Sequence, residues 1–369
     1  PPPPPPPAPN LVEGERLFDV ETFGGNGRTC GTCHMKETGT ITVESVVARH
    51  TTNPGDPLFR HDGLDNGGAG TDRIRTHATI RVELPLPPHI SIQGDPGKRT
   101  IVVNRGVPST LDAPAFDGGT ASPTLMLDLR NASLEEQALG AIQAHAQNTV
   151  PPTSQQLSLI GLAQKLLPRF FSSTALFQFA TGAGSPPTLP ACNTAAECRG
   201  RTWFENVPVV PGSNAGRCGV CHSGPMLNET SIQIVTPLGV TLLPGAKFAN
   251  VRVAERNALN NPVHTFLVDN GSGDIRTVMM ADPGMLLTNP LPASATFGMT
   301  LTHPAQLAGF FKTLPLRNIR NTAPYFHDNS AKSLRAVAEH YATHFFLPLF
   351  GITLSEQDLT DLVAFMMRL

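Results

Sequence analysis

The clearest alternation of hydrophobic and polar positions begins near residue 133. Ser133 and Glu136 have the spacing of a capping box, in which two side chains satisfy the free amides at a helix start. Positions that share one helical face then follow at intervals of three or four residues: Leu134, Ala138, Ile142 and His145. The two prolines at 151–152 end the pattern, so a capped helix is predicted between them and Ser133.

Similar signals predict other helices along the chain. They fall at residues 10–18, 43–49, 155–179 (one or two helices), 199–206, 332–346 and 355–368. The last begins at an acidic capping box, Ser355 and Asp358, and has a buried stripe of Leu359, Leu362, Val363 and Met366. Residues 51–98 and the region before residue 309 lack periodicity, which predicts long loops, at most a short strand at 80–84, and a hairpin. The expected fold is mainly α with little β structure.

The length and composition indicate a loop-rich chain with more than one domain. The 369 residues include 33 glycines and 36 prolines, and 15% are charged. Residues 1–9 are almost all proline and predict an extended polyproline arm. Residues 181–190 are rich in Gly, Ser, Thr and Pro, as linkers are. A net charge of −2 with a pI near 6.7 gives no electrostatic case for nucleic acid, and no apolar stretch is long enough for a transmembrane segment.

Two pentapeptides carry the candidate chemistry. The sequence reads CGTCH at 30–34 and CGVCH at 218–222, and C-x-x-C-H is the attachment signature of a c-type haem. The two thiols meet the vinyl groups of one porphyrin, and the adjacent imidazole becomes the proximal iron ligand. The signature predicts two covalently bound haem c groups on six residues: Cys30, Cys33, Cys218 and Cys221 as attachment points, with His34 and His222 on the irons.

Zinc binding and dithiol redox chemistry are the alternatives for these cysteines. A structural zinc site needs its ligand pairs close together, whereas these pairs are 188 positions apart (218 minus 30) and each has its own histidine. A dithiol motif would not need the histidine twice. Two haems account for the pattern better than either alternative.

The two other cysteines, Cys192 and Cys198, stand in a polar loop. They are expected to close a small disulfide loop, with free thiols as the alternative. A disulfide and covalent haem both indicate a periplasmic or extracellular protein. Because the chain starts in a proline run, a processed form with its signal peptide already removed is expected.

The motifs divide the chain into two similar halves. Both halves have the order helix, C-x-x-C-H, helix. Residues 10–180 are predicted to be an N-terminal cytochrome c domain, 181–198 a linker with the disulfide loop, and 199–369 a C-terminal cytochrome c domain.

Residues 313–328 read TLPLRNIRNTAPYFHD. This block resembles the second domain of the bacterial dihaem cytochrome c peroxidase and MauG superfamily, and the order of the haem motifs and residues 127–137 are similar as well. The resemblance implies that the N-terminal haem reacts with hydrogen peroxide and that the C-terminal haem relays electrons. Oxygenases of polyisoprene belong to the same superfamily.

The resemblance also assigns catalytic positions to the N-terminal half. Where the family has the run F-W-D-G-R, this chain has MLDLR at 126–130, so Leu127 replaces the tryptophan and Arg130 matches the arginine. Gln147 falls on the family's catalytic glutamate; a neutral amide orients peroxide but does not accept its proton. His145 either faces the distal pocket or is a hydrogen-bonded core residue.

The distal iron ligands are assigned with alternatives. The family position for the second haem falls on Tyr341, which shares the buried stripe of its helix. A core tyrosine, a histidine or a methionine sulfur are the alternatives: His340, His344, Met279, Met280, Met285 or Met299. For the first haem, His50 lies 16 residues after His34, which matches a removable distal histidine of the peroxidases.

Three further positions match the family near its second haem. Thr322 and Pro324 correspond to residues whose carbonyls hold an inter-domain calcium ion, and their side chains indicate no metal. His327 is expected either near a propionate or domain interface or in a structural role.

The expected function is therefore a peroxidase-like dihaem oxidoreductase. Hydrogen peroxide or a related oxidant is reduced at the His34 haem with electrons from a donor protein, or a protein substrate is oxidised as by MauG. The alternative is a non-enzymatic electron-transfer or surface cytochrome with both irons six-coordinate. The oligomeric state is open, a homodimer included.

Overall fold

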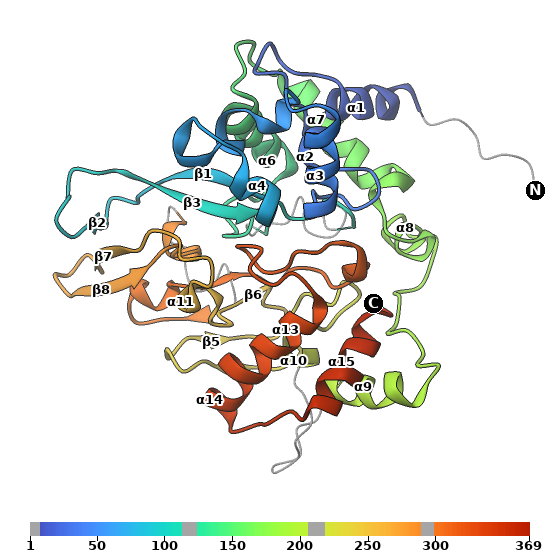
Figure 1. Cartoon of the computed structure of the whole chain (residues 1–369), viewed down its shortest axis with the longest axis vertical. Helices are drawn as coiled ribbons and strands as arrows, with labels where there is room; N and C mark the ends of the chain where they lie inside the picture. The colour runs from blue at the N-terminus through green and yellow to red at the C-terminus, as the bar shows by residue number, and fades with distance from the viewer. Residues whose placement is uncertain (1–7, 113–123, 206–217, 289–298) are drawn as a thin grey trace, which may run out of the picture. The chain divides into compact units, whose positions relative to one another are not determined.

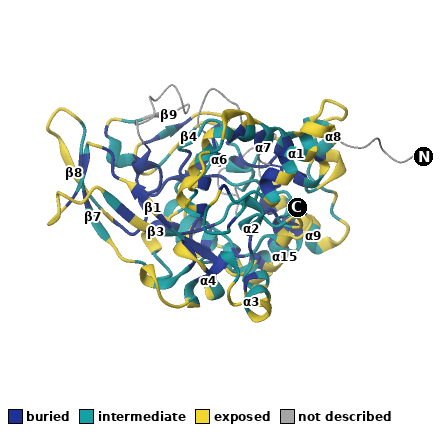
Figure 2. Ribbon diagram, turned by 90° about the horizontal axis from the view of Figure 1, so that it is seen from above, coloured by how far each residue is buried: buried dark blue, intermediate teal, exposed yellow. Residues whose placement is uncertain are grey.

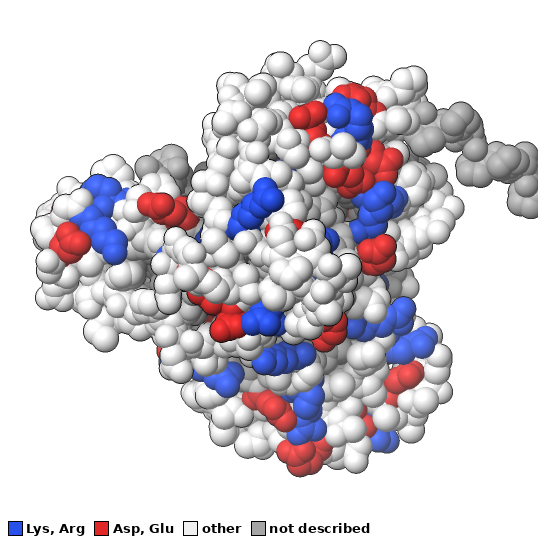
Figure 3. Space-filling model, turned by 45° about the horizontal axis from the view of Figure 1, so that its top comes forward, with Lys and Arg blue, Asp and Glu red and all other residues white. Residues whose placement is uncertain are grey.

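The computed structural model describes residues 8–112, 124–205, 218–288 and 299–369, so most of the predicted proline arm lies outside the described residues. The chain is 41% helical and 14% strand, which confirms the mainly α prediction. None of the helices among these residues has the length and apolar character needed to cross a bilayer. On the face drawn in Figure 3, acidic and basic side chains are interspersed in a mostly uncharged surface.

The chain forms two compact units. The first unit comprises Pro1–Ile80, Val107–Leu125 and Asn131–Pro187, and the second comprises Arg81–Gly106, Met126–Arg130 and Thr188–Leu369. Residues 81–106 and 126–130 therefore pack with the C-terminal half, whereas the sequence division assigned them to the N-terminal domain. One cause is strand pairing, because β2 (Ile90–Ile92) pairs with β7 (His264–Asp269).

Helices of the first unit agree closely with the hydrophobic pattern. They are α1 (Pro9–Asp19), α2 (Cys30–Cys33), α3 (Val43–Thr52), α4 (Asp72–His77), α6 (Leu134–Ala141), the π-helix η4 (Ile142–Ala146), α7 (Ser154–Leu166) and α8 (Thr174–Ala180) (Figure 1). Short 3-10 turns lie between them at Pro57–Phe59, His61–Gly63, Asp65–Gly67 and Pro168–Phe170. The predicted capping box of Ser133 and Glu136 is formed, and the predicted 155–179 segment is two helices.

The helices of the second unit lie mainly at the start and the end of its segment Thr188–Leu369, with the short α11 between them. They are α9 (Ala195–Glu205), α10 (Cys218–Cys221), α11 (Val253–Arg256), α13 (Leu334–His340), the π-helix η9 (Tyr341–Phe346), α14 (Leu347–Phe350) and α15 (Glu356–Met366). Shorter 3-10 turns are Met285–Leu287, Pro304–Leu307 and Ile319–Asn321. The acidic capping box of Ser355 and Asp358 is formed as predicted.

The strands form four small sheets among the described residues. The predicted strand at 80–84 is β1 (Thr79–Pro85), which pairs with β3 (Thr100–Gly106). The predicted hairpin is β7 with β8 (Ile275–Met280), and β2 joins its other edge. Most β8 positions are exposed (Figure 2). The remaining strands are two residues long: β4 (Ile234–Val235), β5 (Thr241–Leu242), β6 (Phe248–Ala249), β9 (Met299–Thr300) and β10 (Phe311–Lys312).

A close helix crossing at a glycine occurs in each unit. A Cβ atom added to Gly14 of α1 would lie 2.2 Å from the Leu159 carbonyl oxygen of α7. In the second unit, a Cβ on Gly200 of α9 would lie 1.9 Å from the Asp361 carbonyl oxygen of α15. Both crossings therefore require the absence of a side chain, and each brings the helix before a C-x-x-C-H motif against a later helix of the same unit.

A second local pattern repeats with an offset of 200 residues (325 minus 125). Leu125 bridges Asn131 in one copy, and Tyr325 bridges Ala331 in the other. Ser133 and Ser333 then cap α6 and α13, and each of these helices continues directly into a π-helix, η4 or η9. The π-helices contain the two strongest distal candidates of the sequence, His145 and Tyr341. π-bulges occur frequently at functional sites, so this repeated feature marks the two π-helices as candidate site elements.

Candidate haem sites

The histidines of both C-x-x-C-H motifs have the same environment. His34 follows α2, and its Nδ1 lies 2.8 Å from the carbonyl oxygen of Gly39. His222 follows α10, and its Nδ1 lies 2.7 Å from the carbonyl oxygen of Leu227, again five residues further on. A carbonyl only accepts, so each Nδ1 donates and each Nε2 keeps its lone pair. Burial lowers the pKa of both imidazoles to about 4, which keeps them neutral as metal ligands must be.

The motif cysteines also fit covalent attachment. Cys30, Cys33, Cys218 and Cys221 are free thiols in this structure. Burial raises the pKa of Cys30 and of Cys218 to about 12, and of Cys221 to about 11, so these thiols are protonated at neutral pH. Two neighbouring free thiols beside a neutral imidazole are the donor set that a haem c requires.

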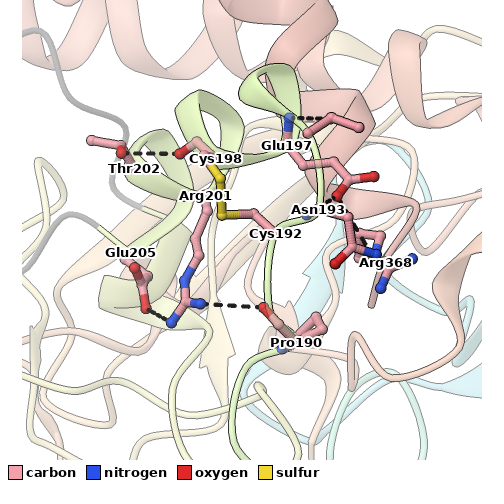
Figure 4. Close-up of a disulfide and its surroundings, with 10 residues drawn as sticks. Pro190, Cys192, Asn193, Glu197, Cys198, Arg201, Thr202, Glu205 and Arg368 are labelled. Atoms are coloured by element: carbon pink, nitrogen blue, oxygen red, sulfur yellow. Dashed lines mark hydrogen bonds and ion pairs between the residues drawn. A yellow bond between two sulfur atoms is a disulfide. The ribbon is translucent and has the colours of Figure 1, made fainter.

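The other two cysteines are bonded to each other, which confirms the predicted disulfide (Figure 4). Cys192 lies just before α9 and Cys198 lies within it. Around the bond, Glu197 accepts a hydrogen bond from the Asn193 amide at 2.6 Å, and Arg201 donates to the Pro190 carbonyl at 3.3 Å. The disulfide therefore fixes the loop that leads into the helix before the second haem motif.

A buried ionic cluster surrounds the first motif. Arg28, two residues before Cys30, pairs with Asp62, and both side chains are almost completely buried. The other Asp62 oxygen, Oδ2, accepts a hydrogen bond from His145 Nδ1 at 2.5 Å. The charge of His145 contributes to the low pKa of His34, so the two imidazoles are close. Arg28 and Asp62 were missed by sequence reasoning, because Asp62 lies in a segment without periodicity.

Gln147 lies next to this cluster without being part of it. Its side chain is exposed, and Oε1 accepts a hydrogen bond at 3.2 Å from Asn26, which also donates to the His145 carbonyl. His145 and Gln147 are thus brought together, but their side chains have different partners. His50 lies 3.4 Å from the Thr71 hydroxyl through Nε2, with its ring against Phe59, so its ligand role stays a prediction.

Tyr341 has the environment expected of a distal residue at the second motif. Burial raises the pKa of its phenol, and the charges of Cys218 and Cys221 contribute, which places the phenol near both attachment cysteines. Its hydroxyl makes no hydrogen bond to any residue that the structure describes, whereas a buried core tyrosine usually finds a partner.

The histidine alternative beside Tyr341 fits less well. His340 is 1% exposed and its Nε2 donates to the Val251 carbonyl at 2.8 Å. Its Nδ1 lies 3.4 Å from the guanidinium of Arg256. Both ring nitrogens are engaged, so neither is free for iron in this conformation. The methionine alternatives differ in burial: Met280 and Met285 are buried, Met279 is exposed, and the Met299 side chain lies outside the described residues.

The comparisons with known proteins concern the fold. No protein-family model and no curated protein matches the sequence. A solved structure of a MauG-like protein associated with microbial copper homeostasis is similar, with a TM-score of 0.52 and 17% identity over 98% of this chain and 90% of that one. This chain has a MauG-like fold. The resemblance expected from the sequence is confirmed at the level of the fold.

Two other structures are similar with lower scores. Hydrazine synthase from Kuenenia stuttgartiensis has a TM-score of 0.49 and 16% identity, over 99% of this chain and 88% of that one. The diheme peroxidase BthA from Burkholderia thailandensis has a TM-score of 0.46 and 14% identity, over 98% and 86%.

Within the MauG-like fold, Arg130 belongs to a charged cluster of the second unit. Arg105 is buried and binds Asp282 through two hydrogen bonds of 2.6 and 2.8 Å and Asp128 through one of 2.7 Å. Arg130 donates to the same Asp128 oxygen at 2.6 Å. The cluster pairs two arginines with two carboxylates, so the contact of Arg130 with Asp128 is part of a structural ionic cluster.

An aromatic stack lies beside this cluster. Phe311 and His327 stack with ring centroids 3.7 Å apart and an interplanar angle of 11°. The Arg105 guanidinium carbon lies 5.7 Å from the Phe311 centroid. Leu127, at the position of the family's tryptophan, is buried against Ala254 and Phe311. His327 is thereby held among packed side chains, with its pKa lowered by burial.

The two positions predicted to hold calcium, Thr322 and Pro324, lie on one turn. Thr322 donates its hydroxyl to the Ile319 carbonyl at 3.2 Å, and a cis peptide joins Ala323 to Pro324. No cluster of three histidine, cysteine or acidic side chains suited to a metal occurs in the part of the chain that the structure describes. Carbonyl ligation by Thr322 and Pro324 stays a prediction.

Proposed function

We propose that this protein is a secreted dihaem c-type oxidoreductase of the cytochrome c peroxidase and MauG superfamily. Cys30 and Cys33 would hold one haem and Cys218 and Cys221 the other. When bound, the two haems supply redox-active iron that binds an oxidant and passes electrons. The observation that carries the proposal is the matched pair of histidines, His34 and His222, each with Nδ1 bound to a carbonyl five residues on and Nε2 free.

The two sites have different roles in this proposal. The His34 site takes hydrogen peroxide or a related oxidant, because a polar and only partly exposed His145 lies near it. The His222 site relays electrons, because Tyr341 lies near its attachment cysteines and has no hydrogen-bond partner among the described residues. Leu127, which stands where the family has a tryptophan, is buried and has no oxidisable ring. The disulfide and the covalent attachment favour the periplasm or the cell exterior.

The experiment is a spectrum of the purified holoprotein with and without peroxide. A high-spin ferric signal, present at rest or after one-electron reduction, that disappears on addition of stoichiometric hydrogen peroxide supports the enzyme. The outcome against it is a pair of low-spin haems whose spectra peroxide leaves unchanged.

A non-enzymatic electron-transfer cytochrome is the second candidate. It is favoured by Gln147, whose neutral side chain is exposed and bonded to Asn26 where the family has its catalytic glutamate. In that case both irons are six-coordinate at every oxidation state, and reduction by a donor protein proceeds at the same rate with or without peroxide.

A further inference from the structure

We propose that Asp62 is a positioning residue that makes His145 the proton acceptor at the His34 haem. This inference rests on the proposed function and concerns the step for which the family uses a glutamate. Asp62 comes from the 3-10 turn His61–Gly63, and His145 comes from the π-helix η4; both belong to the first unit.

The geometry fixes one tautomer of His145. Its Nδ1 lies 2.5 Å from Asp62 Oδ2, and a carboxylate accepts, so Nδ1 carries the hydrogen. Nε2 then keeps its lone pair and is the only ring position free to take a proton. A carboxylate in this arrangement fixes both the tautomer and the orientation of the ring.

Arg28 keeps Asp62 in place and ionised. Its guanidinium pairs with Asp62 Oδ1 and also donates to the carbonyls of Pro57, Leu58 and Arg60, at 2.9, 2.7 and 2.7 Å. Burial alone would raise the pKa of Asp62, but the hydrogen bonds of His145 and Arg28 and the charge of Arg28 act against it, and the pKa is lowered. The carboxyl group therefore stays an anion and leaves the proton on His145.

The cluster lies at the first haem motif. The charges of Arg28 and Asp62 both act on the Cys33 thiol, and the charge of His145 acts on His34. Two further ionisable groups lie near the pair. His61 has its Nδ1 3.9 Å from Asp62 Oδ2 and a side chain that is 43% exposed, and Arg73 donates to the Asp62 carbonyl at 2.8 Å. The His145 side chain itself is 20% exposed.

The step assigned to His145 is a single proton transfer. Hydrogen peroxide gives one proton to Nε2, the O–H bond breaks, and the bonding pair stays on the hydroperoxide anion. His145 becomes an imidazolium, and the Asp62 carboxylate balances its new charge. No electron is transferred in this step. Gln147 does not perform it, because an amide has no comparable basicity and its oxygen is already bonded to Asn26.

Cyanide tests the step without turnover. In neutral solution cyanide is present as HCN, but it binds ferric haem as the anion. A nearby base must therefore take the proton. We expect His145→Gln to slow cyanide binding by about 100-fold and Asp62→Asn to slow it by about 10-fold, with the ferric spectrum unchanged. Asp112→Asn is the matched control, because Asp112 is a buried carboxyl group of the same unit that accepts from Ser172 instead of a histidine.

Three outcomes overturn the proposal. One is an unchanged cyanide rate in His145→Gln, which tests the step even if Asp62→Asn does not fold. Another is equal slowing in Asp62→Asn and Asp112→Asn. The third is a low-spin His34 haem that becomes high-spin in His145→Gln, which would make His145 an iron ligand. The two proposals can fail separately. If cyanide binding is slowed in His145→Gln but the wild-type haems do not react with peroxide, His145 is supported as the proton acceptor and peroxide is rejected as the oxidant.

Discussion

Tyr341 and Tyr325 are the two tyrosines of the chain, and they are held in opposite ways. The Tyr325 hydroxyl donates to the Ile319 carbonyl at 2.8 Å. The Tyr341 hydroxyl has no such partner among the described residues. Burial raises its pKa, and the charges of Cys218 and Cys221 contribute. The same side chain thus has a structural hydrogen bond in one position and is directed toward the haem site in the other.

Tyr341→Phe removes the proposed iron ligand while keeping the ring. We expect the absorption and electron paramagnetic resonance spectra of the His222 haem to change and both haems to remain attached. Tyr325→Phe is the control: it should lower the free energy of unfolding by about 1 kcal/mol, the net value of one hydrogen bond, and leave the spectra unchanged. Identical spectra for wild type and Tyr341→Phe would refute the ligation.

Asp282 predicts an acid dependence of stability. Burial would raise the pKa of Asp282, but the charge and hydrogen bonds of Arg105 outweigh it, so the pKa is lowered from 3.8 in the folded state. A lowered folded pKa adds stability that is complete above the unfolded value and is lost as pH falls through the folded one. The urea-unfolding free energy of the wild type should therefore fall as the pH drops below about 4.

Asp282→Asn checks the sign of this effect. The variant should be less stable at pH 7 by about 3–5 kcal/mol, because the buried Arg105 loses its main partner. Its unfolding free energy should also change less than that of the wild type between pH 5 and pH 3. Parallel pH curves for the two proteins would show that another carboxyl group is responsible.

At the residue scale, local signals predicted the attachment cysteines and proximal histidines because the chemistry fixes their spacing. Arg28 and Asp62 could not be predicted in the same way. Their pairing joins residues 34 positions apart through a turn with no periodicity, and it exists only once the chain has folded. Gln147 was assigned by alignment with a family position; its side chain is exposed, and our proposal places the proton acceptor on the neighbouring His145 instead.

At the element scale, the close crossings at Gly14 and Gly200 and the paired α-to-π transitions define both sites. Capped helices were predicted well, because capping boxes and apolar stripes are local. The two-residue strands and 3-10 turns were not, since elements this short show no periodicity and depend on pairing with distant segments. The π-helices also escaped prediction, because their hydrophobic stripe differs little from that of an α-helix.

Alanine substitutions test the crossings. Gly14→Ala and Gly200→Ala should each lower the free energy of unfolding by about 1–3 kcal/mol, because the methyl group forces the helices apart. Gly140→Ala is the matched control in α6, where an added Cβ meets no atom within 4 Å. It should raise stability by about 0.4–1 kcal/mol. Equal effects at all three positions, measured by urea unfolding, would contradict the packing argument.

At the scale of the whole molecule, the prediction concerns how many haems the chain carries. The protein purified from a host that attaches haem c should have the mass of the polypeptide plus two haems after denaturation. Cys218→Ala with Cys221→Ala should remove one haem and keep the other, whereas Cys192→Ser with Cys198→Ser should retain both. Loss of a haem from the variant with Cys192→Ser and Cys198→Ser would contradict the assignment of the disulfide.

The division into units was only partly accessible from the sequence. The linker and the two motifs indicated two halves, and two compact units are observed. Residues 81–106 and 126–130 were assigned by their position along the chain, and pairing such as that of β2 with β7 cannot be inferred from composition.

This interleaving affects how the protein is made. Strand β2 is synthesised early, yet its partner β7 emerges only after the first unit, the disulfide segment and the second haem motif have been made. Until then, β2 keeps an unpaired edge in a chain that is already long enough to complete most of its first unit. A partner that shields β2 in the meantime would therefore increase the yield of correctly assembled protein.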